Sequence, residues 1–75
     1  MIEVYDINNQ KIKCELLFTF EKDNKKFLVY KDKQDDILAS YYKKEDDKLI
    51  ITPITDDADY DIVDIELEKW WSQNE

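Results

Sequence analysis

Residues 11–20 alternate between apolar and polar side chains over the longest stretch of this kind in the chain. One set of alternate positions is apolar throughout: Ile12, Cys14, Leu16, Phe18 and Phe20. Leu17 is the one apolar residue among the positions between them. A two-residue period places successive side chains on opposite faces of an extended strand. The segment therefore predicts a long β-strand with one buried face, and it requires the 75-residue chain to build its core around a sheet.

Four further segments have strand composition: residues 2–7, 26–31, 37–43 and 48–54. The breaks between them are short, and two of them contain Asn8 with Asn9 and Asp23 with Asn24. Asn and Asp tolerate the positive φ that tight hairpin turns require, and the chain contains no glycine. Because short breaks join antiparallel neighbours, residues 1–54 are predicted to form an antiparallel β-meander of about five strands.

A different pattern begins after this sheet. Thr55 or Asp56 can serve as a helix N-cap. At 100° per residue, one apolar stripe contains Tyr60, Val63, Leu67, Trp70 and Trp71. The alternation of apolar and acidic residues over 63–68 also fits a strand, but the length of the segment and the spacing of the tryptophans favour a helix. We predict one α+β domain over residues 1–75, in which an amphipathic helix at 55–72 packs on one face of the sheet and 73–75 form a tail.

Some apolar side chains are not accounted for by one helix on one sheet face. The central strands carry apolar residues on both faces, and the helix has a second stripe of Ala58, Ile62 and Ile65. Two explanations remain open. A strongly curled sheet can leave a few aliphatic side chains partly exposed. Alternatively, the second stripe is a surface for a homodimer or for another protein.

Acidic residues are concentrated at the C-terminal end. Residues 56–75 contain eight acids and one lysine, whereas residues 1–55 contain eleven acids and ten lysines, for a net charge of −8. On the predicted helix, four acids form a contiguous ridge: Asp57, Asp61, Asp64 and Glu68. Such a ridge can attract a basic protein partner or can simply be a solvated face. Ile62 and Ile65 are the expected apolar anchors of a partner.

Several function classes find no support in the composition. The chain has no histidine, no glycine-rich phosphate loop and one cysteine, Cys14, on the apolar face of a strand. The acidic spacing from Asp57 to Glu68 resembles a calcium loop, but Ile62 stands where that loop requires glycine. We therefore expect no enzyme activity, metal or cofactor. No apolar run reaches the ~20 residues of a membrane span, and we expect a cytoplasmic protein.

Basic and aromatic residues are interleaved over residues 25–31 and 41–44. This arrangement is typical of strands on which RNA bases stack, so a nucleic-acid-processing accessory role is the alternative hypothesis. The net negative charge repels phosphate, and solvated lysines flanking core aromatics are the simpler interpretation. We therefore do not expect nucleic acid as the partner.

Two strings of the chain, residues 16–21 (LLFTFE) and 25–30 (KKFLVY), resemble the core of the domain of unknown function 1292 (DUF1292) family. Residues 39–42 and 49–57 resemble the second half of that family, and the likeness extends over about residues 2–70. The resemblance implies a small acidic bacterial protein of uncharacterised function and brings no catalytic residues. We interpret the sequence as a non-enzymatic protein–protein interaction or adaptor module that binds through its acidic C-terminal helix.

Overall fold

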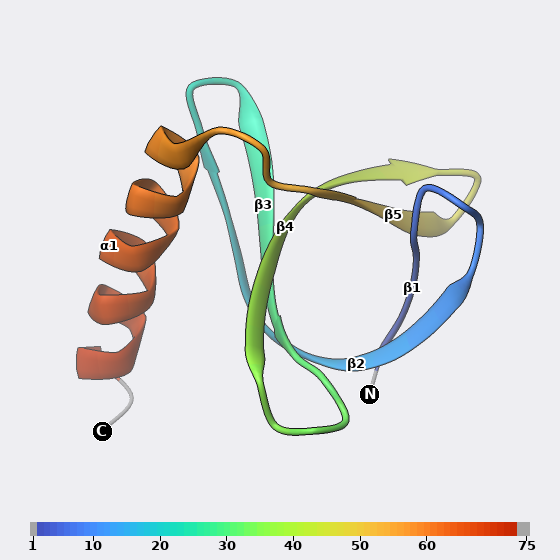
Figure 1. The fold of residues 1–75 in the computed structure, drawn as a ribbon, viewed down its shortest axis with the longest axis horizontal. Helices are drawn as coiled ribbons and strands as arrows, with labels where there is room; N and C mark the ends of the chain where they lie inside the picture. Colours follow the sequence, from blue (N-terminus) through green and yellow to red (C-terminus); the bar gives the residue numbers. More distant parts are fainter. Residues whose placement is uncertain (1, 74–75) are drawn as a thin grey trace.

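The computed structural model describes residues 2–73, in which five strands precede one helix (Figure 1). The elements in chain order are β1 (Ile2–Tyr5), β2 (Lys11–Lys22), β3 (Lys25–Lys31), β4 (Ile37–Glu45), β5 (Lys48–Pro53) and α1 (Asp57–Gln73). The α+β class, the five strands and the C-terminal helix are confirmed. Of the expected tail, Gln73 is the last residue of α1, and residues 74–75 lie outside the described part of the chain.

Asparagine and aspartate form the tight turns of this glycine-free chain. Among residues 2–73, the residues with positive φ are Asn9, Asp23, Asn24, Asp35, Asp46 and Asp47. In each of two loops, an aspartate carboxylate accepts two backbone N–H bonds. Asp6 Oδ1 accepts from Asn8 and Gln10 at 2.8 and 2.9 Å, and Asp32 Oδ1 plays the same part in the β3–β4 loop. These side chains replace the backbone freedom that glycine would supply.

The expectation of an open meander is wrong, because the sheet closes on itself. Each strand pairs antiparallel with its successor, and β1 also pairs in parallel with β5 at Tyr5 and Ile50, which completes a barrel. Figure 1 shows β2 curving from the β1 side of the molecule to the hairpin with β3. Closure buries the inner face of the sheet without a second helix, and it removes most of the exposed sheet edge.

Two apolar clusters result, one on each face of the strands. Inside the barrel lie Val4, Cys14, Leu28, Tyr30 and Ile51. Between the sheet and α1 lie Phe27, Val29, Ile54 and Val63. Because successive side chains of β3 point to opposite faces, this strand contributes to both clusters and is buried on both sides. Barrel closure therefore buries the strand residues Leu28 and Tyr30, which one helix could not cover, whereas Ala58 and Ile65 of the second helix stripe remain exposed.

A β-bulge in β2 corrects the prediction of one continuous apolar face. Leu16 pairs with Tyr30 and Phe18 pairs with Val29, so Leu17 is an extra residue on the β2 side. Ile12 and Cys14 consequently pack in the barrel cluster, whereas Phe18 and Phe20 pack in the helix cluster. Leu16 remains 42% exposed. One inserted residue therefore moves the apolar side chains of β2 from one face of the sheet to the other.

Candidate functional site

The helix begins at a capped N-terminus next to the sheet. Asp56 Oδ1 accepts the backbone N–H of Ala58 at 3.0 Å, and the carbonyl oxygen of Asp56 accepts the N–H of Asp59 at 3.0 Å. Asp56, one of the two residues predicted to cap the helix, is therefore the N-cap. Asp57 and Asp59 follow in the first turn, where the helix dipole favours negative charge.

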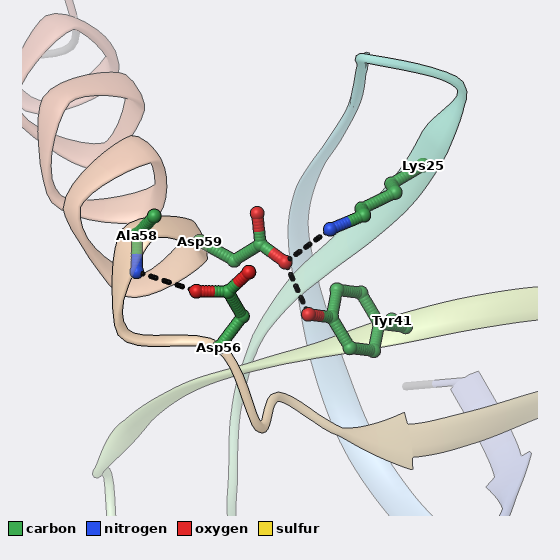
Figure 2. A network of polar contacts seen from close by, with 5 residues as sticks. All are labelled: Lys25, Tyr41, Asp56, Ala58 and Asp59. Atoms are coloured by element: carbon green, nitrogen blue, oxygen red, sulfur yellow. Dashed lines mark hydrogen bonds and ion pairs between the residues drawn. The ribbon is translucent and has the colours of Figure 1, made fainter.

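Asp59 connects this first turn of α1 to two strands (Figure 2). Lys25 Nζ at the start of β3 donates to Asp59 Oδ2 at 2.9 Å, and the hydroxyl of Tyr41 in β4 donates to the same oxygen. Asp59 is only 4% exposed, whereas the side chain of Lys25 is 44% exposed. The Lys25 ammonium also lies 5.8 Å from the centre of the Tyr41 ring. A carboxylate is thereby held at the sheet by one cation and one phenol.

These contacts shift the pKa values of all three groups, and each shift favours the protonation state that the group has in the network. The hydrogen bonds from Tyr41 and Lys25 lower the pKa of Asp59 from its ordinary value. The bond to Asp59 raises the pKa of Lys25, and it likewise raises the pKa of Tyr41. All three groups therefore keep their pH 7 protonation states, and the network acts as a structural clamp between α1 and the sheet.

The sequence interpretation missed this role of Asp59, which it treated only as a helix residue. The signal was available in the spacing, because Asp59, Val63, Glu66 and Trp70 follow the i, i+4, i+7, i+11 pattern of one helix face. The predicted apolar stripe only partly coincides with this buried face of the helix. Val63 is buried and Leu67 and Trp70 are half-buried, but Tyr60 and Trp71 are 48% and 51% exposed.

Tyr60 and Trp71 are displaced because the clamp turns the helix so that Asp59 faces the sheet. The Tyr60 hydroxyl then lies at the margin of the interface and donates to the carbonyl oxygen of Ile54 at 3.2 Å. Trp71 lies at the opposite end of α1, beyond Trp70. Both aromatic side chains therefore border the buried face of α1 instead of forming its centre.

The four acids of the predicted ridge lie outside the buried interface between α1 and the sheet. Asp57, Asp61, Asp64 and Glu68 are all exposed. Within residues 2–73 none of them forms an ion pair, and the single lysine of the helix, Lys69, pairs with Glu66 at 3.6 Å instead. We call these four residues the acidic face of α1. Its carboxylates share one side of the helix, and none lies within ion-pair distance of a described lysine.

The two predicted anchors differ in accessibility. Ile65 is 51% exposed beside the acidic face, so a partner can reach it. Ile62 is half-buried at the margin of the helix–sheet interface, because it lies on the Asp59 and Glu66 side of the helix. Ile65 is consequently the more accessible of the two predicted anchors.

An open groove of about 600 Å³ adjoins the C-terminal half of the acidic face. The residues that line it come from α1 and the start of β4: Ile37, Asp64, Leu67, Glu68, Trp71 and Ser72. Trp71 contacts Trp70 edge-to-face with ring centres 6.0 Å apart, and Trp70 stacks on Phe18 of β2 at 5.5 Å. The exposed indole is thereby supported by an aromatic row that reaches the sheet. We call this cleft the Trp71 groove.

The interleaved lysines and aromatics of the strands are partly occupied by internal contacts. Lys25, Lys26, Tyr41 and Tyr42 line an open pocket of about 300 Å³. Two of these four, Lys25 and Tyr41, already bind Asp59. Their ammonium and hydroxyl groups are therefore committed to the protein itself, which leaves less of this surface for a nucleic acid.

Groups for covalent or metal chemistry are sparse in the described chain. Cys14 is buried in the barrel, and this burial raises the pKa of its thiol. Among residues 2–73 no three Cys, Asp or Glu side chains are arranged to hold a metal ion. In the same part of the chain, no helix combines the length and apolar character needed to cross a bilayer.

The family of proteins described as "Protein of unknown function (DUF1292)" matches residues 8–71, which is most of the chain. The chain belongs to the DUF1292 family. The match extends from the β1–β2 turn to Trp71, so it includes the clamp, the acidic face and most of the groove. No curated protein and no solved structure matches this DUF1292 member.

Proposed function

We propose that this DUF1292 protein is a non-enzymatic interaction module that binds a basic protein through the acidic face of α1. The observation that supports this proposal is that, within residues 2–73, the four exposed carboxylates form no ion pair and lie on one side of a helix that is packed by its other side. A partner with lysine or arginine on its surface would supply the missing counter-charge and would be steered toward this face.

Solubility alone is a weaker explanation for the arrangement. Asp57 with Asp61 and Asp64 with Glu68 are like-charge pairs at i, i+4, and each such pair destabilises a helix by roughly 0.2–0.5 kcal/mol. Acids scattered over the strands would keep the protein soluble without this cost. A repulsive row that is retained on one face is consistent with a use in binding, where a cationic partner relieves the repulsion.

The experiment is an affinity capture from nuclease-treated lysate with three baits, at low and moderate salt. The first bait is the wild type, and the second carries Asp57→Asn, Asp61→Asn, Asp64→Asn and Glu68→Gln. The third is a matched control with the same change in charge at exposed acids outside the helix: Glu15→Gln, Glu21→Gln, Asp36→Asn and Glu45→Gln.

We expect the wild type and the control to capture the same basic protein and to release it as the salt concentration rises. We expect the helix variant to capture none of this protein. Screening of exposed charges over roughly 8 Å at physiological ionic strength accounts for the salt effect. Capture of the same protein by the helix variant would reject the acidic face as the binding surface.

The alternative, a nucleic-acid accessory role through the lysine–aromatic strands, has less support. Lys25 and Tyr41 are engaged by Asp59, and the excess of negative charge opposes phosphate. Nuclease treatment in the capture experiment separates the two proposals, because a partner held through RNA would be lost from all three baits.

A further inference from the structure

We propose that the Trp71 groove is a recognition site for a lysine or arginine side chain, presented by a basic segment of the partner protein. This inference rests on the proposed function and locates where the partner's first cation would bind. The groove is lined by the half-buried apolar side chains of Ile37 and Leu67, the exposed indole of Trp71, and two exposed carboxylates, Asp64 and Glu68, which we call its rim acids.

Each part of the groove matches one part of a long cationic side chain. The aliphatic stem of lysine or arginine favours apolar surface while its head remains at the rim. The charged head can lie near the indole face, where a cation–π contact adds attraction. The carboxylates of Asp64 and Glu68 then accept hydrogen bonds from the head, and guanidinium offers a bidentate geometry that ammonium lacks.

The electrostatic setting favours a cation over other occupants. The last turn of α1 contains no basic residue, so the negative end of the helix dipole is not compensated there. A phosphate would be repelled by both rim acids. A purely apolar segment would cover Leu67 and Trp71 but would draw water away from Asp64 and Glu68 without replacing it, which is costly.

The indole of Trp71 is available and its position is defined. Among residues 2–73, the cation–π contacts are those of Lys25 with Tyr41 and of Lys48 with Tyr5, and neither involves Trp71. The contact with Trp70, which stacks on Phe18, holds the indole at the edge of the groove. Because the indole of Trp71 is 51% exposed and already packed against Trp70, it can contact a partner with little loss of conformational entropy.

The test uses a blocked synthetic peptide with lysine at every third position and leucine and alanine between. A second peptide has arginine in place of lysine, and a third has glutamine. Binding is measured by NMR titration of the ¹⁵N-labelled full chain, with the indole N–H of Trp71 as the local probe. The Trp71→Phe variant assigns that signal relative to Trp70.

Two double variants separate the groove from the rest of the acidic face. Asp64→Asn with Glu68→Gln removes both rim acids, and Asp57→Asn with Asp61→Asn removes the same charge one to two turns away. At physiological salt we expect the rim variant to weaken lysine-peptide binding roughly three- to tenfold. We expect the distal variant to weaken it less than about twofold, because neither Asp57 nor Asp61 lines the groove, so they act on the bound cation only through solvent and without a hydrogen bond.

The outcomes distinguish this inference from the proposed function. Equal losses for the two double variants, with the Trp71 signal unmoved, would overturn the groove site and leave the acidic face as a diffuse binding surface. Loss only in the rim variant, together with capture of the partner by a bait that carries Asp57→Asn and Asp61→Asn, would support the groove and reject the wider face. Capture of the partner by the four-acid variant would reject both. Equal binding of the glutamine peptide would show an apolar docking site, and no binding of any peptide would equally overturn the inference.

Discussion

The packing of α1 on the sheet can be tested by truncating Val63. This side chain is 6% exposed and contacts the cluster of Phe27, Val29 and Ile54. Val63→Ala removes two carbon groups from the interface, which costs about 1.6 kcal/mol in transfer free energy. A cavity that does not collapse adds up to about 1 kcal/mol, and the better helix propensity of alanine returns about 0.5 kcal/mol.

We therefore expect Val63→Ala to lower the free energy of unfolding by about 2 kcal/mol. A domain of this length has a total stability on the order of 4–11 kcal/mol, so the variant should remain folded. The corresponding fall in Tm is roughly 8–16 °C. Urea titration followed by circular dichroism measures the change, and an unchanged m-value would show that the surface exposed on unfolding is the same.

Ile65→Ala is the matched control on the same helix. Because Ile65 is 51% exposed, its truncation removes less buried surface and leaves no enclosed cavity. We expect a loss of about 0.8 kcal/mol, less than half of that for Val63→Ala. Equal losses, or a larger loss for Ile65→Ala, would refute the orientation of α1 described here. The pair also separates stability from binding, since only Ile65 borders the acidic face.

Two further predictions concern the clamp and the bulge. A carboxyl whose pKa is lowered by folding stabilises the protein above its ordinary pKa of about 3.9, and this contribution disappears as the pH falls through the folded-state value. The difference in Tm between wild type and Asp59→Asn should thus shrink below about pH 4. It should also shrink at high pH, as the pH rises through the pKa values of Lys25 and Tyr41, which the bond to Asp59 raises above their ordinary values of about 10. Asp61→Asn is the control at an exposed helix acid that forms no ion pair within residues 2–73, and it should not lower the Tm at pH 7. Equal losses of Tm for the two variants would argue against the clamp. Deletion of Leu17 removes the extra residue, so Leu16 can still pair with Tyr30 and Phe18 with Val29, and the variant should fold with Phe18 and Phe20 on the helix side. Its stability should fall about as far as that of Leu17→Ala, because both variants lose the packing of the Leu17 side chain. A deletion variant that does not fold, or whose NMR contacts place Phe18 and Phe20 away from α1, would contradict the assigned register.

Local chemistry predicted the elements of this fold but not the closure of its sheet. The turns at Asn9 and Asp23 are visible in the sequence because only a few residue types tolerate positive φ. Closure depends on the pairing of Tyr5 with Ile50, which are far apart in the chain, and nothing in either residue marks the other as a partner. The curvature that brings them together arises from the whole sheet.

The bulge and the clamp were missed for different reasons. Leu17 has apolar neighbours on both sides, so the inserted residue does not interrupt the apolar pattern that would reveal it. An acid in the first helical turn has a sufficient local explanation in the dipole, which conceals the role of Asp59 at the sheet. The acidic face could be predicted because its four members depend only on helical spacing, whereas the Trp71 groove also requires Ile37 from β4.

The fold fixes α1 at both ends, and this bears on what its outer face can do. Asp59 ties the first turn to Lys25 and Tyr41, and Trp70 stacks on Phe18 near the last turn. A helix held in this way presents its carboxylates at intervals set by the 5.4 Å pitch, without the disorder of an acidic tail. Under the proposed function, this rigidity reduces the ordering cost of association and favours partners whose cations match the spacing. A face that served solubility alone would gain nothing from such attachment. Mutations that loosen either end should therefore weaken binding even though they leave every acidic side chain in place.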